Sequence, residues 1–316
     1  MSVSGLLRPP AIGRKSGNGA AISIIAPASY AQTERVDRGM KALNAIGLAA
    51  RATEHAGLRG PLYFAGAPAQ RLADLHAAFL DPETRAVMCV RGGYGSNYLL
   101  AGLDLEVIRR HPKIFFAYSD LTAIQLRLLD RLGLPAFHGP MAAADFAIED
   151  GVHLASFEAA IAGQPYAVGA GEGLRVLKAG AASGVLYGGC LTILAALLGT
   201  PWEPETEGKL LFIEDRGAKP YQIDRMLWQL RAAGKLKRVK GIVFGEMLDC
   251  ASPGAAPDLL EQAILNALDG LDVPIAIGLR SGHVSRGNVT LTFGVAAELE
   301  ANDAPVLRMV EPAVAA

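Results

Sequence analysis

Cysteine, aromatic residues and net charge are all scarce in this sequence. Its 316 residues include three cysteines, 6% aromatic residues and a formal net charge of only -1. Cys89, Cys190 and Cys250 lie far apart, without the short spacings of a zinc site or a disulfide scaffold. We therefore expect a protein of a reducing compartment with no metal site.

The charge balance also excludes some partners. A net charge near zero creates no strong attraction for nucleic acid or anionic lipid. The basic run at Lys235, Lys237, Arg238 and Lys240 is short and typical of a solvated helix end, so no nucleic-acid partner is expected. Residues 1–18 lack the apolar run of a signal peptide, and no later stretch resembles a membrane span. These features favour a cytoplasmic protein with a small-molecule partner and no membrane partner.

Hydrophobic residues, by contrast, are plentiful and periodic. They make up 51% of the chain against 19% charged residues, which is typical of a compact globular protein, and the length favours two domains. Short apolar runs alternate with amphipathic segments in the first half, a pattern that predicts βαβ units and a parallel sheet. We expect an N-terminal α/β domain over residues 1–150, a linker over 151–175 and a mixed α+β domain over 176–316.

The period of the apolar residues also predicts individual elements. Strands are expected at residues 22–26, 86–90, 114–117, 210–213, 242–244, 274–277 and 289–291. Helices are expected to include residues 36–43, 72–79, 121–132, 191–198 and 223–230. The two tryptophans, Trp202 and Trp228, are expected in the domain core.

Ser119 is the candidate nucleophile. It lies between the predicted strand 114–117 and the helix that follows, where a tight turn can lift a hydroxyl above the sheet edge. The first N–H groups of that helix have no partner within the helix, so that of Asp120 is available to an oxyanion. The alternative, which this local pattern alone favours, is that Ser119 or Asp120 merely caps the helix.

A glycine-rich turn, residues 91–95, follows another predicted strand. Its sequence is Arg-Gly-Gly-Tyr-Gly, and adjacent glycines let backbone approach a ligand or place an N–H group opposite Ser119. The spacing matches neither a P-loop nor a dinucleotide fingerprint, so a phosphate role has little support. A plain tight turn is an equally good interpretation.

A serine nucleophile needs a base and an acid to orient that base. Among the six histidines, His55, His76, His111 and His153 read as structural or solvated, and His138 follows a predicted strand where it could line a cleft. His283 lies beside Gly282 just after a strand, where a side chain can project from a loop end. Glu214 closes the apolar strand 210–213 and is the candidate acid, unless it pairs with Arg216 or a lysine instead.

Taken together, these segments resemble the L,D-carboxypeptidase family of serine peptidases, which includes murein-recycling enzymes and microcin C immunity peptidases. The resemblance runs in order from Ala26 to Gly294. It rests on the segments Ala26-Pro27-Ala28-Ser29, Tyr63-Phe64-Ala65-Gly66, Arg91-Gly92-Gly93-Tyr94-Gly95, Tyr118-Ser119-Asp120-Leu121-Thr122, His138-Gly139-Pro140, Gly199-Thr200-Pro201, Phe212-Ile213-Glu214-Asp215, residues 221–227 and Gly282-His283.

The resemblance implies a fold, a site and a reaction. It implies an N-terminal Rossmann-like domain that carries Ser119, a C-terminal domain that carries Glu214 and His283, and an active site at their boundary. The roles it implies are nucleophile for Ser119, acid for Glu214, base for His283, and oxyanion donors from the N–H groups of Asp120 and Gly93. The implied reaction removes the terminal D-alanine from a murein tetrapeptide, with no cofactor, and a homodimer is common among such proteins.

Alternatives and departures belong beside this resemblance. A microcin-immunity-type peptidase would cleave an aminoacyl- or peptidyl-nucleotide amide with the same residues. A non-catalytic peptide- or nucleotide-binding module is possible because a fold does not fix a function. Cys190 stands where the family commonly has asparagine after two glycines, and Ala117 where it has glycine, while Arg91 is a candidate for the substrate carboxylate or for a structural ion pair.

Overall fold

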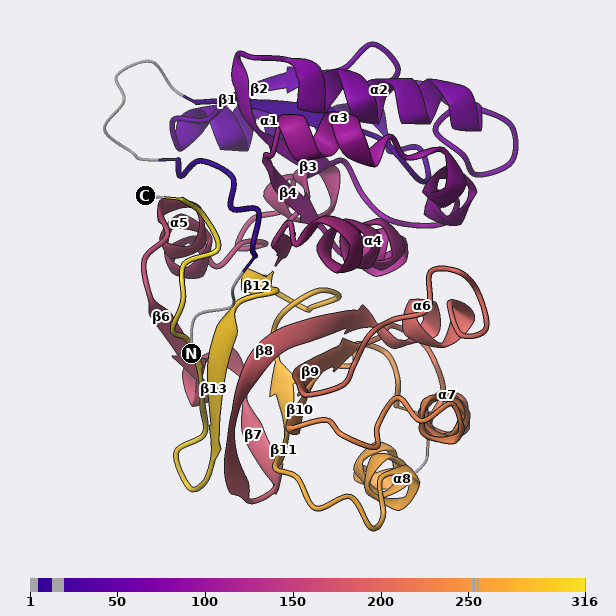
Figure 1. Ribbon diagram of the computed structural model, residues 1–316, viewed down its shortest axis with the longest axis vertical. Coiled ribbons are helices and arrows are strands. Elements are labelled where there is room, and N and C mark those ends of the chain that lie inside the picture. Colours follow the sequence, from indigo (N-terminus) through magenta and orange to yellow (C-terminus); the bar gives the residue numbers. More distant parts are fainter. Residues whose placement is uncertain (1–4, 13–19, 252–253, 255, 316) are drawn as a thin grey trace.

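The computed structural model describes residues 5–12, 20–251, 254 and 256–315. Two β-sheets form the centres of two lobes, the first built mainly from the first half of the chain and the second from the remainder (Figure 1). No described helix is both long enough and apolar enough to span a bilayer. The predicted α/β class with a second mixed domain is therefore confirmed, while the predicted domain boundaries stay a prediction.

The first sheet has six strands in the order β12-β5-β4-β3-β1-β2. Five of them are parallel, and β12 joins antiparallel to β5. Their bounds are β1 Ala21–Ile25, β2 Ala49–Ala52, β3 Thr84–Cys89, β4 Ile114–Ala117, β5 Ala136–His138 and β12 Leu291–Phe293. The loops at the carboxyl ends of the parallel strands meet at one edge, which is where such sheets usually bind ligands.

Helices connect these strands and cover the sheet. They are α1 Thr33–Ala45, α2 Pro68–Leu80, α3 Leu105–Arg110, α4 Thr122–Leu132 and α5 Leu154–Ala162, with short 3-10 segments Ser96–Gly102 and Ser119–Leu121 and a π-helical turn Ala142–Phe146. Amphipathic sequence explains their packing, because α1 buries Val36 and Leu43 and exposes its charged face.

The second sheet has eight strands in the order β6-β14-β13-β8-β9-β10-β11-β7. Strands β8, β9, β10 and β11 are parallel, and the flanking pairs are antiparallel. The bounds are β6 Tyr166–Gly169, β7 Arg175–Lys178, β8 Gly180–Cys190, β9 Lys209–Glu214, β10 Gly241–Gly245, β11 Ile275–Leu279, β13 Ala296–Ala301 and β14 Val306–Met309. The helices of this lobe are α6 Leu191–Ala196, α7 Pro220–Ala232 and α8 Leu259–Ala267, preceded in the chain by the 3-10 turn Ala170–Glu172.

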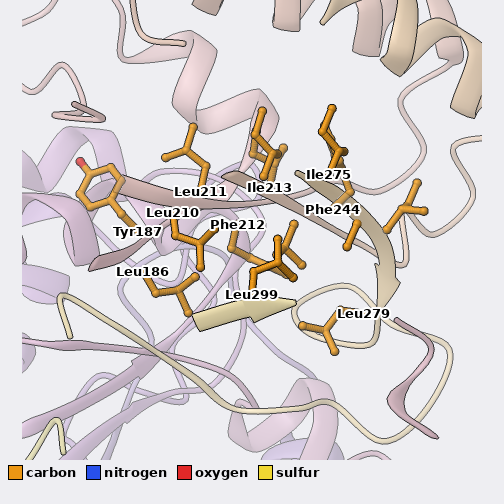
Figure 2. Packing of buried hydrophobic residues seen from close by; sticks show 14 of the residues in the cluster. Leu186, Tyr187, Leu210, Leu211, Phe212, Ile213, Phe244, Ile275, Leu279 and Leu299 are labelled. Atoms are coloured by element: carbon orange, nitrogen blue, oxygen red, sulfur yellow. The ribbon is translucent and has the colours of Figure 1, made fainter. Parts of the chain in front are cut away.

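Buried side chains cover both faces of the second sheet. Figure 2 shows Leu210 and Phe212 among the packed side chains, together with Leu211 and Ile213, and all four are at most 1% exposed. A strand that is buried on both faces has a continuous apolar sequence, as β9 does. This core holds the end of β9, and with it Glu214, in a fixed position.

Two expectations need correction. Trp228 is 64% exposed, because it lies on the side of α7 opposite the buried Ile223 and Leu227. The strand expected at residues 289–291 begins two residues later, as β12, and it pairs with β5 of the first sheet. The linker over residues 151–175 stays a prediction, and the segment contains α5 and β6. Much of the N-terminal stretch considered for a signal peptide lies outside the described residues.

Candidate active site

Ser119 lies on a strained turn between β4 and α4. Its φ angle is 65°, in the left-handed region that serine rarely adopts, and Tyr118 before it is extended. Such a strand-turn-helix raises the hydroxyl above the sheet edge, as in nucleophile elbows of hydrolases. Such strain persists only where the surrounding structure imposes it.

Two neighbouring segments fix the turn. The Asp120 carboxylate accepts a hydrogen bond from the Ser96 N–H at 2.8 Å, and the Ser96 hydroxyl donates to the Asp120 carbonyl at 2.7 Å. A Cβ on Gly92 would lie 2.7 Å from the Ser119 Cβ, so only glycine fits there. The turn 91–95 therefore packs directly against Ser119, as its glycines suggested.

Gly93 is held in a similar way from the other side. Its φ is 114°, and an added Cβ would lie 2.4 Å from the Ser29 Oγ. The Ser29 hydroxyl accepts a hydrogen bond from the Tyr94 N–H at 3.1 Å. Within the described residues, neither the Gly93 N–H nor the Asp120 N–H donates a hydrogen bond, so both are available to a ligand.

Glu214, which is buried, and His283, which is partly exposed, form a pair at the end of the second sheet. Glu214 is 0% exposed, and its Oε2 accepts hydrogen bonds from the His283 Nδ1 at 2.7 Å and from the His283 N–H at 3.0 Å. A Cβ on Gly282 would lie 2.7 Å from the Glu214 carboxyl carbon, so glycine lets the loop approach this closely. The bond to Nδ1 leaves Nε2 as the nitrogen that faces outward, which is the arrangement of an oriented base.

The pair stabilises its charged forms despite burial. Burial lowers the pKa of His283, but the charge and hydrogen bond of Glu214 raise it more, so the net shift is upward. Burial raises the pKa of Glu214, and the charge and hydrogen bonds of His283 lower it below its ordinary value. The Glu214 carboxylate is therefore ionised, and it raises the basicity of the imidazole.

Asp145 connects the two lobes beside this pair. It is 6% exposed, and its carboxylate accepts hydrogen bonds from the Tyr118 hydroxyl at 3.3 Å, the Asn288 amide at 3.0 Å and the Met141 N–H at 2.8 Å. Asn288 also bonds the Gly282 backbone in both directions, each at 3.0 Å. This network holds the His283 loop against the first lobe. Burial raises the pKa of Asp145 to about 6.

Ser119 and His283 line one cavity of about 600 Å³ at the boundary of the lobes. Gly92, Gly93 and Tyr118 lie on the same wall. No hydrogen bond joins the Ser119 hydroxyl to the His283 ring within the described residues. In ligand-free sites such bonds are commonly long and shorten when substrate binds. The cavity has the size of a small-molecule site.

The remaining candidates fall elsewhere. His138 is fully buried beneath the cavity, among the rings of Tyr118, Phe212 and Phe293, and it does not line the cavity. Burial lowers the pKa of His138 to about 4, so the ring is neutral. Arg216 pairs with Asp249 rather than with Glu214, which removes the alternative considered for that carboxylate.

The two departures from the family pattern are both buried. The Cys190 N–H donates to the Thr122 hydroxyl at 3.2 Å, which joins the end of β8 to α4 across the lobe boundary. Ala117 accepts hydrogen bonds at its carbonyl from the Gln125 amide and the Gly139 N–H. Backbone groups make these contacts, so they do not require asparagine or glycine at the two positions.

Sequence reasoning missed Asp145 and Asn288. Asp145 lies in an alanine-rich stretch with weak periodicity, and no motif marks it. Asn288 is 143 residues away from it in sequence. The only sequence signal at Asp145 and at Asn288 is a single polar residue among apolar neighbours. This pattern is too common to indicate that the two residues are in contact.

Comparison with known proteins now defines the class. Residues 22–139 match the LD-carboxypeptidase N-terminal domain, and residues 183–299 match the LD-carboxypeptidase C-terminal domain. The chain belongs to the LD-carboxypeptidase family and is a serine-type carboxypeptidase, a hydrolase.

Individual relatives agree with this assignment. A probable murein peptide carboxypeptidase of Bacillus subtilis is 36% identical over 94% of this chain and 93% of its own. A murein tetrapeptide carboxypeptidase of Pseudomonas aeruginosa is 33% identical over 89% and 93%. The crystal structure of an MccF-like protein from Bacillus anthracis superposes with a TM-score of 0.86 at 25% identity, covering 96% of this chain and 99% of the other. MccF is a microcin C7 self-immunity protein.

Proposed function

We propose that this carboxypeptidase removes the terminal D-alanine from murein tetrapeptides, with Ser119 as nucleophile, His283 as general base and Glu214 as the acid that orients it. One observation carries the proposal. The Glu214–His283 pair, with Nδ1 and Oε2 2.7 Å apart, opens onto the cavity that the strained Ser119 also lines. A nucleophile, a base and an orienting acid are the parts that acyl transfer needs.

The reaction proceeds in two halves. The Ser119 Oγ attacks the carbonyl carbon of the terminal peptide bond as the His283 Nε2 takes the hydroxyl proton. The N–H groups of Asp120 and Gly93 stabilise the oxyanion, and His283 then gives the proton to the departing amine as the C–N bond breaks. Water attacks the acyl-enzyme with the same proton transfers and releases the shortened peptide. Each donor to the oxyanion is worth roughly 10²- to 10³-fold in turnover.

The substrate assignment is supported by the names and the identity of the relatives. Two of them, at 36% and 33% identity, carry names that specify murein peptides. The cavity also suits a peptide end, because residues of both lobes line it and three of its arginines, Arg91, Arg216 and Arg286, are exposed. Recycling of such peptides takes place inside the cell, and the three free, buried cysteines are consistent with a reducing cytoplasm.

The test is mass spectrometry of a diaminopimelate-containing murein tetrapeptide after incubation with wild-type protein and with Ser119→Ala. We expect wild type to release one alanine and Ser119→Ala to release none while keeping the wild-type melting temperature. Alanine release by Ser119→Ala would refute the assignment of the nucleophile.

The same assay separates the alternatives. Failure of wild type to cleave the tetrapeptide, with cleavage of an aminoacyl-nucleotide amide, would identify a microcin-immunity-type peptidase. Failure on both substrates, together with an unreactive Ser119 toward a serine-directed electrophile, would leave a binding module. A homodimer is part of the proposal and is tested by light scattering on the purified protein.

A further inference from the structure

The cavity is far more positive than the protein that contains it. Four arginines line it, namely Arg35, Arg91, Arg216 and Arg286, whereas the whole chain has a net charge of -1. Asp145 is the one acidic residue on the cavity wall in the described chain, and burial raises its pKa to about 6. A concentration of one charge sign in a cleft favours a ligand of the opposite sign.

The four arginines differ in what they already hold. The Arg35 guanidinium donates to the carbonyls of Ala143 and Ala144, so it supports the cavity wall. Arg91 and Arg286 are exposed and form no ion pair within the described residues. Arg216 differs from all three, because a side-chain carboxylate orients it.

Asp249 holds Arg216 by one edge of the guanidinium. The Arg216 Nε donates to the Asp249 Oδ2 at 3.3 Å, and the two terminal nitrogens make no hydrogen bond within the described residues. The backbone fixes the segment that carries Asp249, because the Gly217 N–H donates to the Leu248 carbonyl at 2.9 Å. Two parallel N–H groups on a guanidinium are the geometry that binds a carboxylate in bidentate fashion.

Arg216 also lines the same cavity as His283. It follows Glu214 by two residues, and its charge, together with burial, lowers the pKa of His283 against the larger upward effect of Glu214. In the proposed reaction the departing amine receives its proton from His283. The terminal carboxylate carbon is about 2.5 Å from that amine nitrogen, across one Cα. A cation that binds the terminal carboxylate must therefore lie close to His283.

We propose that Arg216, oriented by Asp249, binds the terminal carboxylate of the peptide and so restricts cleavage to the last peptide bond. This inference rests on the proposed function and adds the residue that selects the free chain end. The exposed Arg216–Asp249 pair is itself worth little, so an incoming carboxylate meets little competition. Among the described residues, no side-chain carboxylate orients Arg35, Arg91 or Arg286 in this way.

The test crosses two substrates with wild type and a set of variants. One substrate is the murein tetrapeptide with a free terminal carboxylate, and the other is the same peptide with a terminal carboxamide. The proteins are wild type, Arg216→Met, Arg216→Lys, and Arg286→Met as the matched control from the same cavity. We expect wild type to prefer the free acid by roughly 10- to 100-fold in kcat/KM, the range of a charged bidentate contact.

Arg216→Met should lose this preference, by an increase of KM for the acid and no change for the amide. Arg216→Lys should recover part of it, because lysine keeps the charge but not the planar fork. Arg286→Met should keep the wild-type ratio. The proposal is overturned if wild type cleaves both substrates equally, if Arg216→Met keeps the preference, or if Arg286→Met loses it to the same extent.

A binding measurement keeps this inference separate from the proposed reaction. Calorimetric titration of Ser119→Ala and Ser119→Ala/Arg216→Met with the two peptides reads carboxylate recognition without turnover. We expect only the first protein to bind the acid more tightly than the amide. If Ser119→Ala binds the acid and the amide with equal affinity, the role of Arg216 is refuted even if wild type hydrolyses the tetrapeptide. If Ser119→Ala prefers the acid but wild type does not hydrolyse the tetrapeptide, only the proposed reaction is refuted.

Discussion

The two lobes prepare their parts of the site by different physical means. The first lobe uses backbone conformation, because Ser119 is held at a φ of 65° and Gly92 is too close to it to carry a Cβ. The second lobe uses charge, because Glu214 is fully buried and balanced by the imidazole of His283. The proposed nucleophile is thus positioned by shape, and the proposed base by electrostatics.

This difference predicts which substitutions each lobe tolerates. Around Ser119, the side chains of Ser96 and Asp120 form hydrogen bonds to backbone groups. The close packing of this turn depends on glycines, because a Cβ atom would not fit at their positions. Around His283, the critical quantity is one negative charge on Glu214, and a change that preserves shape still removes it. Shape changes should therefore damage the first lobe most, and charge changes the second.

The largest effect should come from Glu214→Gln, which keeps the shape and removes the charge. The amide no longer stabilises the imidazolium or fixes the Nδ1 tautomer, and kcat should fall roughly 10³- to 10⁴-fold. Steady-state hydrolysis of the tetrapeptide measures this loss, with the melting temperature as a control for folding. Near-wild-type turnover would mean that shape alone positions His283, and the contrast between the lobes would fail.

The pH profile of the same variant tests whether the charge of Glu214 raises the pKa of His283. His283 must be neutral to act as a base, so wild-type kcat/KM should fall as the pH drops through a midpoint above the ordinary 6.5 of histidine. Glu214→Gln removes the cause of that increase and leaves burial, which lowers the pKa. The midpoint of its residual activity should therefore move to lower pH, and a midpoint that stays or rises would contradict the assigned pair.

The next effect, in the first lobe, should come from adding one methyl group. Gly92→Ala would place a Cβ 2.7 Å from the Ser119 Cβ and 2.9 Å from its Oγ, so the turn must shift and the oxyanion donors with it. We expect kcat to fall roughly 10²- to 10³-fold, the cost of losing one such donor. Kinetics on the tetrapeptide measure the loss.

Gly57→Ala is the matched control for that change. An added Cβ at Gly57 meets no atom within 4 Å, and its φ is not in the left-handed region. This variant should keep wild-type kcat and a similar melting temperature. Equal losses in the two variants, or none in Gly92→Ala, would show that the Ser119 turn is not set by close packing.

The sequence predicted those features that depend on neighbouring residues, and it did not predict those that depend on residues far apart in the chain. The strand expected at residues 114–117 agrees with β4, because four buried apolar residues before a turn are a local pattern. The local pattern around Ser119, a strand, a small residue and a helix, equally fitted a helix cap, and only the resemblance of many ordered segments to a known family made Ser119 the candidate nucleophile. Its left-handed φ was not foreseen, since serine rarely adopts it and the cause lies in Gly92 and Ser96, which are distant in sequence.

Contacts between distant segments were not predictable. The pairing of β12 with β5 joins Leu291 to His138, and the Asn288–Asp145 bond joins residues that are 143 positions apart. No local period encodes such pairings. Trp228 shows the related limit for burial, because a large apolar side chain on an amphipathic helix reads as core although the helix turns it outward.

His138 offers the smallest expected effect and the closest comparison with His283. The charge of Glu214 raises the pKa of both imidazoles. Neither ring nitrogen of His138 has a hydrogen-bond partner among the described residues, however, and its ring lies between the aromatic rings of Phe212 and Phe293. Burial lowers its pKa to about 4. The ring fills space as phenylalanine would, at the cost of two unsatisfied nitrogens.

His138→Phe should therefore leave kcat unchanged and alter stability at pH 7 by less than about 1.5 kcal/mol. The acid limb should differ more. Because the folded pKa of His138 lies below the ordinary 6.5, the lowered pKa adds no cost above pH 6.5 and destabilises wild type by about 3 kcal/mol as the pH falls to 4. Urea unfolding between pH 7 and 4 should show that His138→Phe loses less stability than wild type. A marked loss of kcat would instead mean that His138 acts on Glu214, and that the electrostatic half of the site extends into the first sheet.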